Sequence, residues 1–266
     1  MKLGFMGGGV MAEAIVKGVL GKSAATAEDI SVCEIVASRR EFLRETYRVA
    51  ATADAREALR SAEIVVLAVK PQEFPVAAKE IKAALQDSQT VMSIMAGIRI
   101  AALSEALSHK AIVRVIPNTP AQVGEGASVW TATPEVTEAA RNEVAKVLSA
   151  LGLEAYVDNE KYIDMATAVS SSGPAYIFLV IEAMIDAAVH IGMRRELATP
   201  LVVQTVLGSA RYAQASGKHP AELKNQVTSP GGTTVEGLLA LEEAGLRAAF
   251  TAAIEAAYEK AVRLGG

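Results

Sequence analysis

A glycine-rich string lies near the N-terminus, directly after a short apolar run. It reads Gly7-Gly8-Gly9-Val10-Met11-Ala12 and fits the spacing G-x-G-x-x-A. Between a strand and a helix, the first glycine of this spacing permits a tight turn, and the second lets the backbone approach a pyrophosphate. The first N–H groups of the helix then attract phosphate oxygens. The string therefore predicts a dinucleotide site, against the alternative of a glycine-rich turn without a ligand.

Two kinds of charge follow the next predicted strand, where a dinucleotide would place its adenosine ribose. Glu34 ends that strand, and a carboxylate there can bind the ribose hydroxyls and repel a 2′-phosphate, which favours NADH. Arg39 and Arg40 come next, and guanidinium groups can hold a 2′-phosphate, which favours NADPH. A solvated helix start would also explain the two arginines. The choice between NADPH and NADH stays open, with Glu34 predicted to discriminate against NADPH.

Short apolar runs alternate with helical patterns through the first half of the chain. Strands are predicted over residues 2–6, 30–33, 64–69, 91–95 and 112–116, and helices over 11–20 and 40–47. The run 64–69 is continuously apolar, which suits a strand that is buried on both faces of a sheet. This rhythm predicts an α/β domain whose parallel sheet carries helices on both faces.

The second half of the chain has no convincing strand from about residue 161 onward and reads as all-helical. Residues 174–191 and 197–215 are apolar on nearly every side, and 235–264 is an alanine-rich helical segment. A helix that is apolar all round must be buried in a core or against a partner. One small helical domain has little interior for several such helices. We therefore expect domains over 1–160 and 161–266, and an intertwined homodimer built through the second.

The overall composition excludes several other classes of protein. The formal net charge is −4 and aromatic residues make up 5%, so the chain lacks the basic stripe and the stacking platforms of a nucleic-acid binder. A single cysteine, Cys33, excludes an internal disulfide and a cysteine-based zinc site. No apolar run approaches the roughly 18 residues of a membrane span, and Glu13 and Lys17 interrupt the stretch that could pass for a signal peptide. We expect a cytoplasmic protein without a membrane or nucleic-acid partner.

Five further strings, in order over essentially the whole chain, carry a family resemblance. They are Ala68-Val69-Lys70-Pro71-Gln72, Ser93-Ile94-Met95-Ala96-Gly97-Ile98, Arg114-Val115-Ile116-Pro117-Asn118-Thr119-Pro120, Ser172-Gly173-Pro174-Ala175-Tyr176 and Ser229-Pro230-Gly231-Gly232-Thr233-Thr234. With the glycine string, they resemble pyrroline-5-carboxylate reductase. The resemblance implies a doubly wound Rossmann domain followed by an all-α dimerisation domain, and a homodimer that can assemble into a decamer. It also implies reduction of 1-pyrroline-5-carboxylate to L-proline with NADPH or NADH.

Two of these strings close predicted strands, and ligands of doubly wound sheets lie outside the carboxyl ends of strands. Ala68-Val69-Lys70-Pro71 closes the longest apolar run, and Pro71 can lift the next backbone segment over a cofactor. Lys70 suits a structural or cofactor contact better than proton transfer. Ala96-Gly97 closes the following strand, where small residues would let a nicotinamide ribose pack closely. The expected cofactor contacts are thus Gly7, Gly8, Gly9, Val10, Met11, Glu34, Ala68, Val69, Lys70, Pro71, Ala96 and Gly97.

The other strings carry the expected substrate contacts. Asn118 follows a strand between two prolines that restrict its loop, although a rigid turn without a ligand is the alternative. The string Ser229–Thr234 can form a backbone nest for a carboxylate just before a helix, although a capped helix start would look the same. The resemblance places Thr234 against the imine nitrogen, as the catalytic residue. The expected substrate contacts are Asn118, Ser229, Gly231, Gly232, Thr233 and Thr234.

Three acidic or basic residues on one helical face give a weaker signal. Glu182, Asp186 and His190 are four residues apart, but a polar interface seam suits them better than an acid–base or metal site, so no metal is expected. The alternative enzyme is a 3-hydroxyacid dehydrogenase, which would need a lysine base in the long interdomain helix. Residues 172–191 contain no lysine. Outside the enzymes, the alternative is a noncatalytic NAD(P) sensor, and the dense substrate strings count against it.

Overall fold

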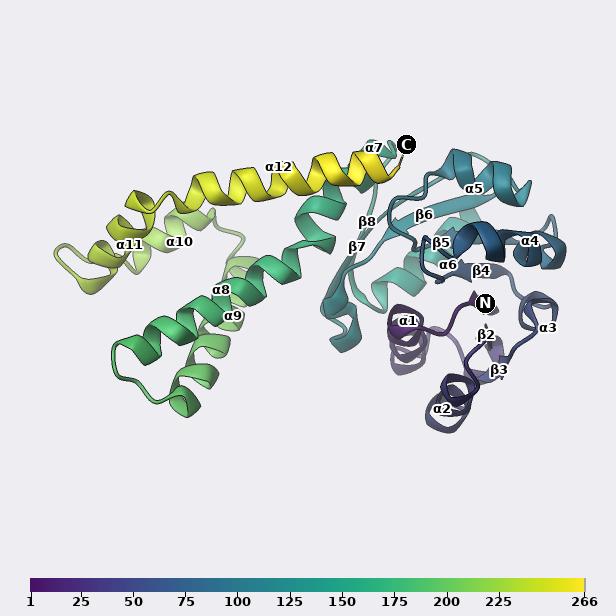
Figure 1. Cartoon of the computed structure of the whole chain (residues 1–266), viewed down its shortest axis with the longest axis horizontal. Coiled ribbons are helices and arrows are strands. Elements are labelled where there is room, and N and C mark those ends of the chain that lie inside the picture. Colours follow the sequence, from purple (N-terminus) through teal and green to yellow (C-terminus); the bar gives the residue numbers. More distant parts are fainter. Residues whose placement is uncertain (266) are drawn as a thin grey trace. The chain divides into compact units, whose positions relative to one another are not determined.

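The computed structural model describes residues 1–265 and contains an eight-stranded sheet in the order β3-β2-β1-β4-β5-β6-β7-β8 (Figure 1). The strands are β1 Leu3–Met6, β2 Ile30–Cys33, β3 Ala50–Thr52, β4 Ile64–Leu67, β5 Thr90–Ser93, β6 Ile112–Ile116, β7 Gly126–Ala132 and β8 Gly152–Tyr156. Neighbouring strands are parallel except β6 and β7. The predicted Rossmann-type α/β fold is confirmed.

Helices cover both faces of this sheet. One face carries α1 (Val10–Gly21), α2 (Ala37–Tyr47) and α6 (Glu138–Ser149), and the other carries α3 (Ala55–Leu59), α4 (Phe74–Ala84) and α5 (Ile100–Leu107). Successive strand residues alternate between the two cores, so that in β1 Phe5 joins the first and Met6 the second. Strands that are buried on both faces need apolar side chains at every position, which explains the unbroken apolar run of β4.

β7 runs antiparallel to β6, which corrects the expectation of a wholly parallel sheet. The segment 117–125 joins the two strands and holds only the 3₁₀ helix η2 (Thr119–Val123). A parallel return needs a crossover of about a dozen or more residues, so this short connection turns the chain back beside β6. The sequence pattern predicts neither β7 nor β8, nor β3, because these segments mix small, polar and apolar side chains.

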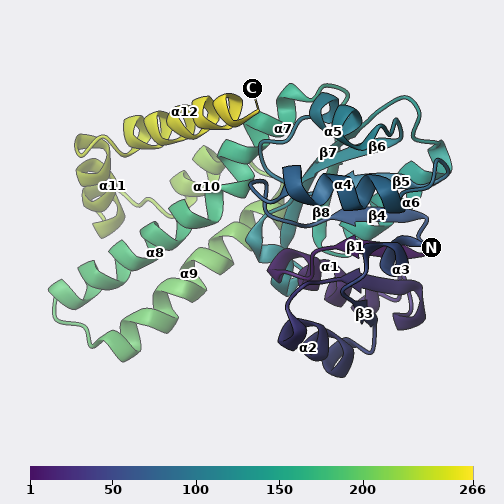
Figure 2. The same ribbon diagram turned by 45° about the vertical axis from the view of Figure 1, so that its right-hand side comes forward.

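The chain divides into two compact units, residues 1–172 with the end of α12 from Ala257, and residues 173–256. The first unit also holds the 3₁₀ helix η1 (Ala27–Asp29), α7 (Lys161–Ala166) and η3 (Thr167–Ser171), which is a π-helix. The second holds α8 (Gly173–His190), α9 (Arg195–Ser216), α10 (Pro220–Gln226), α11 (Thr233–Glu243) and the start of α12 (Leu246–Leu264). Within it, α8 and α9 lie side by side (Figure 2). The expected helix over 235–264 is interrupted at Gly245, whose φ is +75°.

The helices of the second unit leave large apolar side chains exposed in the single chain. No residue of α8 is buried, and Phe178 and Leu179 are 63% and 65% exposed. The helical stretch Lys161–His190 reaches a mean hydropathy of 1.5 over an 18-residue window that is only 6% buried, so by length and composition it could cross a membrane. This corrects the expectation that no segment is long and apolar enough. Helix faces with this many exposed apolar side chains are stable in water only where another apolar surface covers them.

Gly152, at the start of β8, occupies a position that admits no side chain. Its φ is +136°, and an added Cβ would lie 2.2 Å from the carbonyl oxygen of Gly126. Gly152→Ala should lower the free energy of unfolding by about 2–4 kcal/mol, because it adds backbone strain and overpacking. Gly21→Ala, at the end of α1 with open space around it, is the control and should change it by less than about 1 kcal/mol. Urea denaturation measures both variants, and equal stabilities would contradict the steric argument.

Candidate active site

The glycine string forms the turn between β1 and α1 at the carboxyl end of the sheet. Gly7 has a φ of +97°, and an added Cβ would lie 2.8 Å from the carbonyl oxygen of Ala68, just after β4. The Gly7 N–H donates to the Cys33 carbonyl at the end of β2 (2.8 Å). β1 lies between β2 and β4, where the connections change direction, and open α/β sheets bind their ligands at such switch points.

The start of α1 is open in the way that a phosphate site requires. Gly9 is its N-cap, makes no side-chain capping bond, and would meet nothing within 4 Å of an added Cβ. Val10 is 62% exposed. The N–H groups of the first helical turn, including that of Met11, have no acceptor within the helix. The loop therefore fits the pyrophosphate of a dinucleotide, while the individual contacts stay predictions.

The Glu34 carboxylate points at the glycine loop. Its two oxygens accept from the N–H groups of Gly8 and Val36, each at 2.8 Å. Arg39 Nε donates to the Gly8 carbonyl (2.6 Å), and Arg40 Nη1 donates to the Glu34 carbonyl (2.7 Å). The ribose and phosphate contacts that the sequence suggests for these side chains stay predictions. Sequence reasoning missed the backbone contacts, because they depend on how α2 lies against the loop.

Glu13, in the first turn of α1, joins that helix to α2. Its carboxylate accepts from Arg39 Nη2 (2.5 Å) and from the Tyr47 hydroxyl (2.7 Å). Burial raises the pKa of the Glu13 carboxyl, but the hydrogen bonds from Tyr47 and Arg39 outweigh it and hold this pKa below its ordinary value. Burial and the bond to Glu13 raise the pKa of Tyr47 to about 12. The carboxylate is therefore charged and the phenol protonated at neutral pH.

The other expected cofactor contacts lie just after β4 and β5, at the same edge of the sheet. After β4, Ala68, Val69 and Pro71 are half-buried and Lys70 is exposed. After β5, Ala96 is exposed, and Gly97 has a φ of +74°. A Cβ added to Gly97 would lie 3.0 Å from the Cβ of Leu264, near the end of α12. The glycine therefore has a packing role that sequence reasoning missed, besides its predicted cofactor contact.

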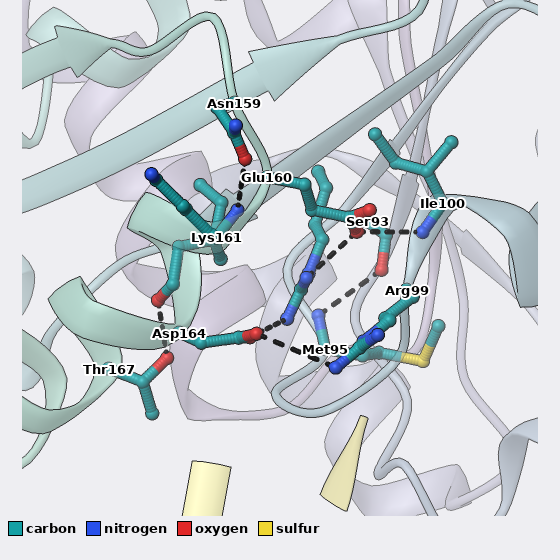
Figure 3. Close-up of polar contacts among 11 residues, drawn as sticks. Ser93, Met95, Arg99, Ile100, Asn159, Glu160, Lys161, Asp164 and Thr167 are labelled. Carbon is teal, nitrogen blue, oxygen red and sulfur yellow. Dashed lines mark hydrogen bonds and ion pairs between the residues drawn. The ribbon is translucent and has the colours of Figure 1, made fainter. Parts of the chain in front are cut away.

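A buried ion network holds the loop between β5 and α5 against α7 (Figure 3). The Arg114 side chain on β6 is 1% exposed and donates to one oxygen each of Glu160 and Asp164, at 2.8 Å. The same Glu160 oxygen accepts from the Ile100 N–H at the start of α5 (2.8 Å). Arg99 places a second cation 4.0 Å from Asp164. The buried guanidinium of Arg114 thus faces two carboxylates, as a buried charge requires, although its Nε has no hydrogen-bond partner within the described part of the chain.

Asn118 links β7 to the π-helix. Its Nδ2 donates to the carbonyl and hydroxyl oxygens of Ser170 (3.2 and 3.3 Å), and its Oδ1 accepts from the Ala127 N–H (2.8 Å). The Ser172 N–H donates to the Thr167 carbonyl (2.9 Å), which is the five-residue spacing of a π-helix. The side chain therefore has partners within the protein at both ends, and its substrate contact stays a prediction.

The string Ser229–Thr234 forms the loop before α11 and its first turn, in the second unit. Gly231 has a φ of +67°, and an added Cβ on Gly232 would lie 2.5 Å from the Ser229 hydroxyl oxygen. Gly232 is the N-cap of α11 and makes no side-chain capping bond, while the two threonines of the string are the first helical residues. An uncapped first turn offers its N–H groups to an anion.

Cys33 is a buried thiol, and α8 carries the polar residues Glu182, Asp186 and His190. Burial, with smaller effects of nearby acids, raises the pKa of the Cys33 thiol to about 11, so it is protonated at neutral pH. Asp186 forms an exposed ion pair with Arg195 of α9 (2.8 Å), in keeping with a polar seam. Among residues 1–265, no three acidic, histidine or cysteine side chains are placed to hold a metal ion.

Asp164 supplies one of the two carboxylates that face buried Arg114. Asp164→Asn keeps the shape and removes the charge, so the free energy of unfolding should fall by about 3 kcal/mol. Glu143→Gln on α6 is the matched control, because Glu143 pairs with Lys146 at the surface and such pairs contribute at most about 1 kcal/mol. Chemical denaturation of the two variants gives the comparison. A loss as small as that of the control would mean that solvent screens Arg114.

Comparisons with known proteins agree with this geometry. The family model for pyrroline-5-carboxylate reductase dimerisation matches residues 160–264, and that for NADP oxidoreductase, coenzyme F420-dependent, matches residues 2–97. The pyrroline-5-carboxylate reductase of Synechocystis is 39% identical over 265 residues, which cover 100% of this chain and 98% of that protein. The solved structure of the Coxiella burnetii enzyme has a TM-score of 0.93 at 36% identity, and that of Plasmodium falciparum pyrroline carboxylate reductase with NADP bound has 0.89 at 34%. Both matches cover 100% of this chain and 98% of the other. The chain therefore belongs to the pyrroline-5-carboxylate reductase family.

Proposed function

We propose that this reductase binds its substrate at the start of α11. It is an NAD(P)H-dependent enzyme that reduces 1-pyrroline-5-carboxylate to L-proline, the last step of proline biosynthesis. The observation that carries the substrate assignment is the uncapped first turn of α11, with Gly231 and Gly232 shaping the loop before it. A carboxylate there gains hydrogen bonds from free N–H groups and the positive end of the helix. Ser229 and Thr233 complete the proposed carboxylate pocket.

Thr234 is the proposed catalytic residue, with its hydroxyl against the imine nitrogen. The imine can enter already protonated, so the site needs no strong general acid. The hydroxyl then accepts a hydrogen bond from the N–H of the iminium ion, while the α11 backbone holds the carboxylate. Two anchors fix the imine carbon in one orientation, and such positioning lowers the barrier. Asn118 is proposed as a further substrate contact, because it follows β6 at the edge where ligands bind.

The bound NADPH or NADH supplies the hydride. We assign its pyrophosphate to the loop from Gly7 to Met11, because that loop fits a dinucleotide and the start of α1 is uncapped. Its adenosine half is assigned to the side of the loop next to Glu34, the residue directly after β2. Its nicotinamide half is assigned to Ala68, Val69, Lys70 and Pro71 after β4 and to Ala96 and Gly97 after β5.

The second unit is proposed to form a homodimer, and five such dimers a decamer. The family's dimerisation region covers residues 160–264, close to the proposed domain division of 1–160 and 161–266. Apolar side chains exposed on α8 and α9 supply the surface. On this proposal the membrane-length stretch Lys161–His190 is covered by a second copy of the chain. The proposed enzyme is cytoplasmic, with no membrane or nucleic-acid partner.

Oxidation of NADPH and NADH, with and without 1-pyrroline-5-carboxylate, tests the activity. We expect oxidation that depends on the imine and yields proline in equal amount. Tight cofactor binding without any turnover would instead indicate a noncatalytic sensor. Turnover with a 3-hydroxyacid but not with the imine would indicate the alternative dehydrogenase.

Thr234→Val keeps the shape of the side chain and removes its hydroxyl. Loss of one hydrogen bond to a charged group costs about 1.5–3 kcal/mol, so kcat/KM for the imine should fall by roughly ten- to a hundredfold. Cofactor affinity should hardly move. The control is Thr251→Val on α12, where the hydroxyl bonds only the Arg247 carbonyl of its own helix. Steady-state kinetics and a direct NADPH titration measure both; wild-type kinetics for Thr234→Val would remove it from the site.

Leu179→Asp tests the dimer. Leu179 on α8 is 65% exposed in the single chain, and a charge there would be buried without a partner in the proposed interface. Leu153→Asp on β8 is the matched control, because Leu153 is 67% exposed and lies in the other unit. Analytical ultracentrifugation should give smaller species for Leu179→Asp and the wild-type assembly for Leu153→Asp. A wild-type assembly for both would place the interface elsewhere.

A further inference from the structure

Both backbone hydrogen-bonding groups of Gly8 are paired with charged side chains. Its N–H donates to the Glu34 carboxylate at 2.8 Å, and its carbonyl accepts from Arg39 Nε at 2.6 Å. Nη2 of the same arginine also lies 3.5 Å from the Gly9 carbonyl. The middle residue of the glycine loop is thus held between an anion and a cation from the segment after β2. Hydrogen bonds to charged groups are roughly twice as strong as neutral ones.

The two charged side chains are themselves held in place. The second oxygen of Glu34 accepts from the Val36 N–H at 2.8 Å, so both oxygens have backbone donors. Arg39 forms an ion pair with Glu13 at 2.5 Å, and both side chains are only about a quarter exposed, at 25% and 24%. The Tyr47 hydroxyl donates to the other Glu13 oxygen, and Arg39 stacks over the Phe42 ring at 4.8 Å. Glu13 and Phe42 thus contact Arg39 directly, and Tyr47 holds Glu13 in place.

The Glu34 and Arg39 side chains are not directed as recognition of the adenosine ribose or of its 2′-phosphate would require. Discrimination by Glu34 against NADPH needs a carboxylate directed at the ribose, and recognition of a 2′-phosphate by Arg39 needs a guanidinium directed at solvent. Both side chains are instead directed at the loop backbone, with donors or acceptors already in place. Neither contact distinguishes one nicotinamide cofactor from the other.

We propose that Glu34 and Arg39 are positioning residues that clamp the backbone of Gly8 on both sides and hold the glycine loop in its phosphate-binding shape for NADH and NADPH alike. Glycine loses more backbone freedom on ordering than any other residue, and three consecutive glycines make this loop costly to order. The clamp orders the loop before the cofactor arrives, which lowers the entropy that binding must offset. The inference rests on the cofactor part of the proposed function and is independent of the substrate loop.

The test combines loop exchange in the cofactor-free protein with direct titrations of NADH and NADPH. Glu34→Gln leaves one acceptor oxygen for two backbone donors, and Arg39→Met removes every contact to the loop carbonyls. Arg39→Lys keeps the charge and can restore one contact. Glu41→Gln is the matched control, since Glu41 forms an exposed ion pair with Arg44 on the same helix and makes no loop contact. Peptide-level hydrogen exchange over residues 7–12 reports the loop, and fluorescence titration reports each dissociation constant.

We expect faster exchange of the loop in Glu34→Gln and Arg39→Met, an intermediate rate in Arg39→Lys, and no change in Glu41→Gln. The dissociation constants for NADH and NADPH should rise together, by about tenfold. Since titration needs no imine, a failed substrate assignment would leave this result intact.

Three outcomes would overturn the proposal. If Glu34→Gln weakens NADH and strengthens NADPH, the carboxylate reads the ribose; if Arg39→Met weakens NADPH alone, the guanidinium reads the 2′-phosphate. Unchanged loop exchange in both variants would also contradict the clamp. Tyr47→Phe keeps the test open if a variant fails to fold, because it removes only the bond that steadies Glu13. It should raise both dissociation constants by the same factor, smaller than that of Arg39→Met.

Discussion

The buried guanidinium of Arg114 is the constraint on which the first unit depends. A charge that is 1% exposed stays in the interior only where carboxylates face it. Glu160, the N-cap residue of α7, and Asp164, within that helix, meet this requirement. Glu160 also accepts from the first N–H of α5. These bonds therefore hold β6, α5 and α7 together beside the loop that follows β5. The apolar pattern of β6 by itself does not predict that α7 packs beside this strand.

A carboxylate that accepts a hydrogen bond from a loop N–H group also occurs beside the glycine loop. Near α5, the Glu160 carboxylate holds a backbone N–H, and near α1 the Glu34 carboxylate holds that of Gly8. The side-chain amide of Asn118 likewise forms hydrogen bonds to backbone groups, and these join β7 to the π-helix. Loops that bind ligands bury few apolar side chains of their own, so directional polar bonds from neighbouring elements must order them. Hydrogen bonds of this kind thus fix the loops at the ends of the strands, where ligands are expected.

The second unit follows a different rule, because its helices expose the surfaces that a core would normally cover. α8 has no buried residue in the single chain, and its length and hydropathy would pass for a membrane span. The family's dimerisation region includes this helix. The loop before α11 belongs to the same unit, with an uncapped helix start shaped by two glycines. The unit whose apolar helices are uncovered in the single chain thus also carries the proposed carboxylate site.

Patterns that are local in the chain were predictable from the sequence, and contacts between distant segments were not. Apolar periodicity predicted the β4 strand and the helical second half, and the spacing of the glycines predicted the turn before α1. The sequence strings also indicated the family. The sequence did not predict β7 and β8, because short segments of mixed polarity take their structure from neighbouring strands. It also did not predict that the helical segment breaks at Gly245. The sequence predicted ligand contacts for Glu34, Arg39 and Asn118. Only the tertiary structure decided their partners, since a hydrogen bond depends on which atoms the fold brings within about 3 Å.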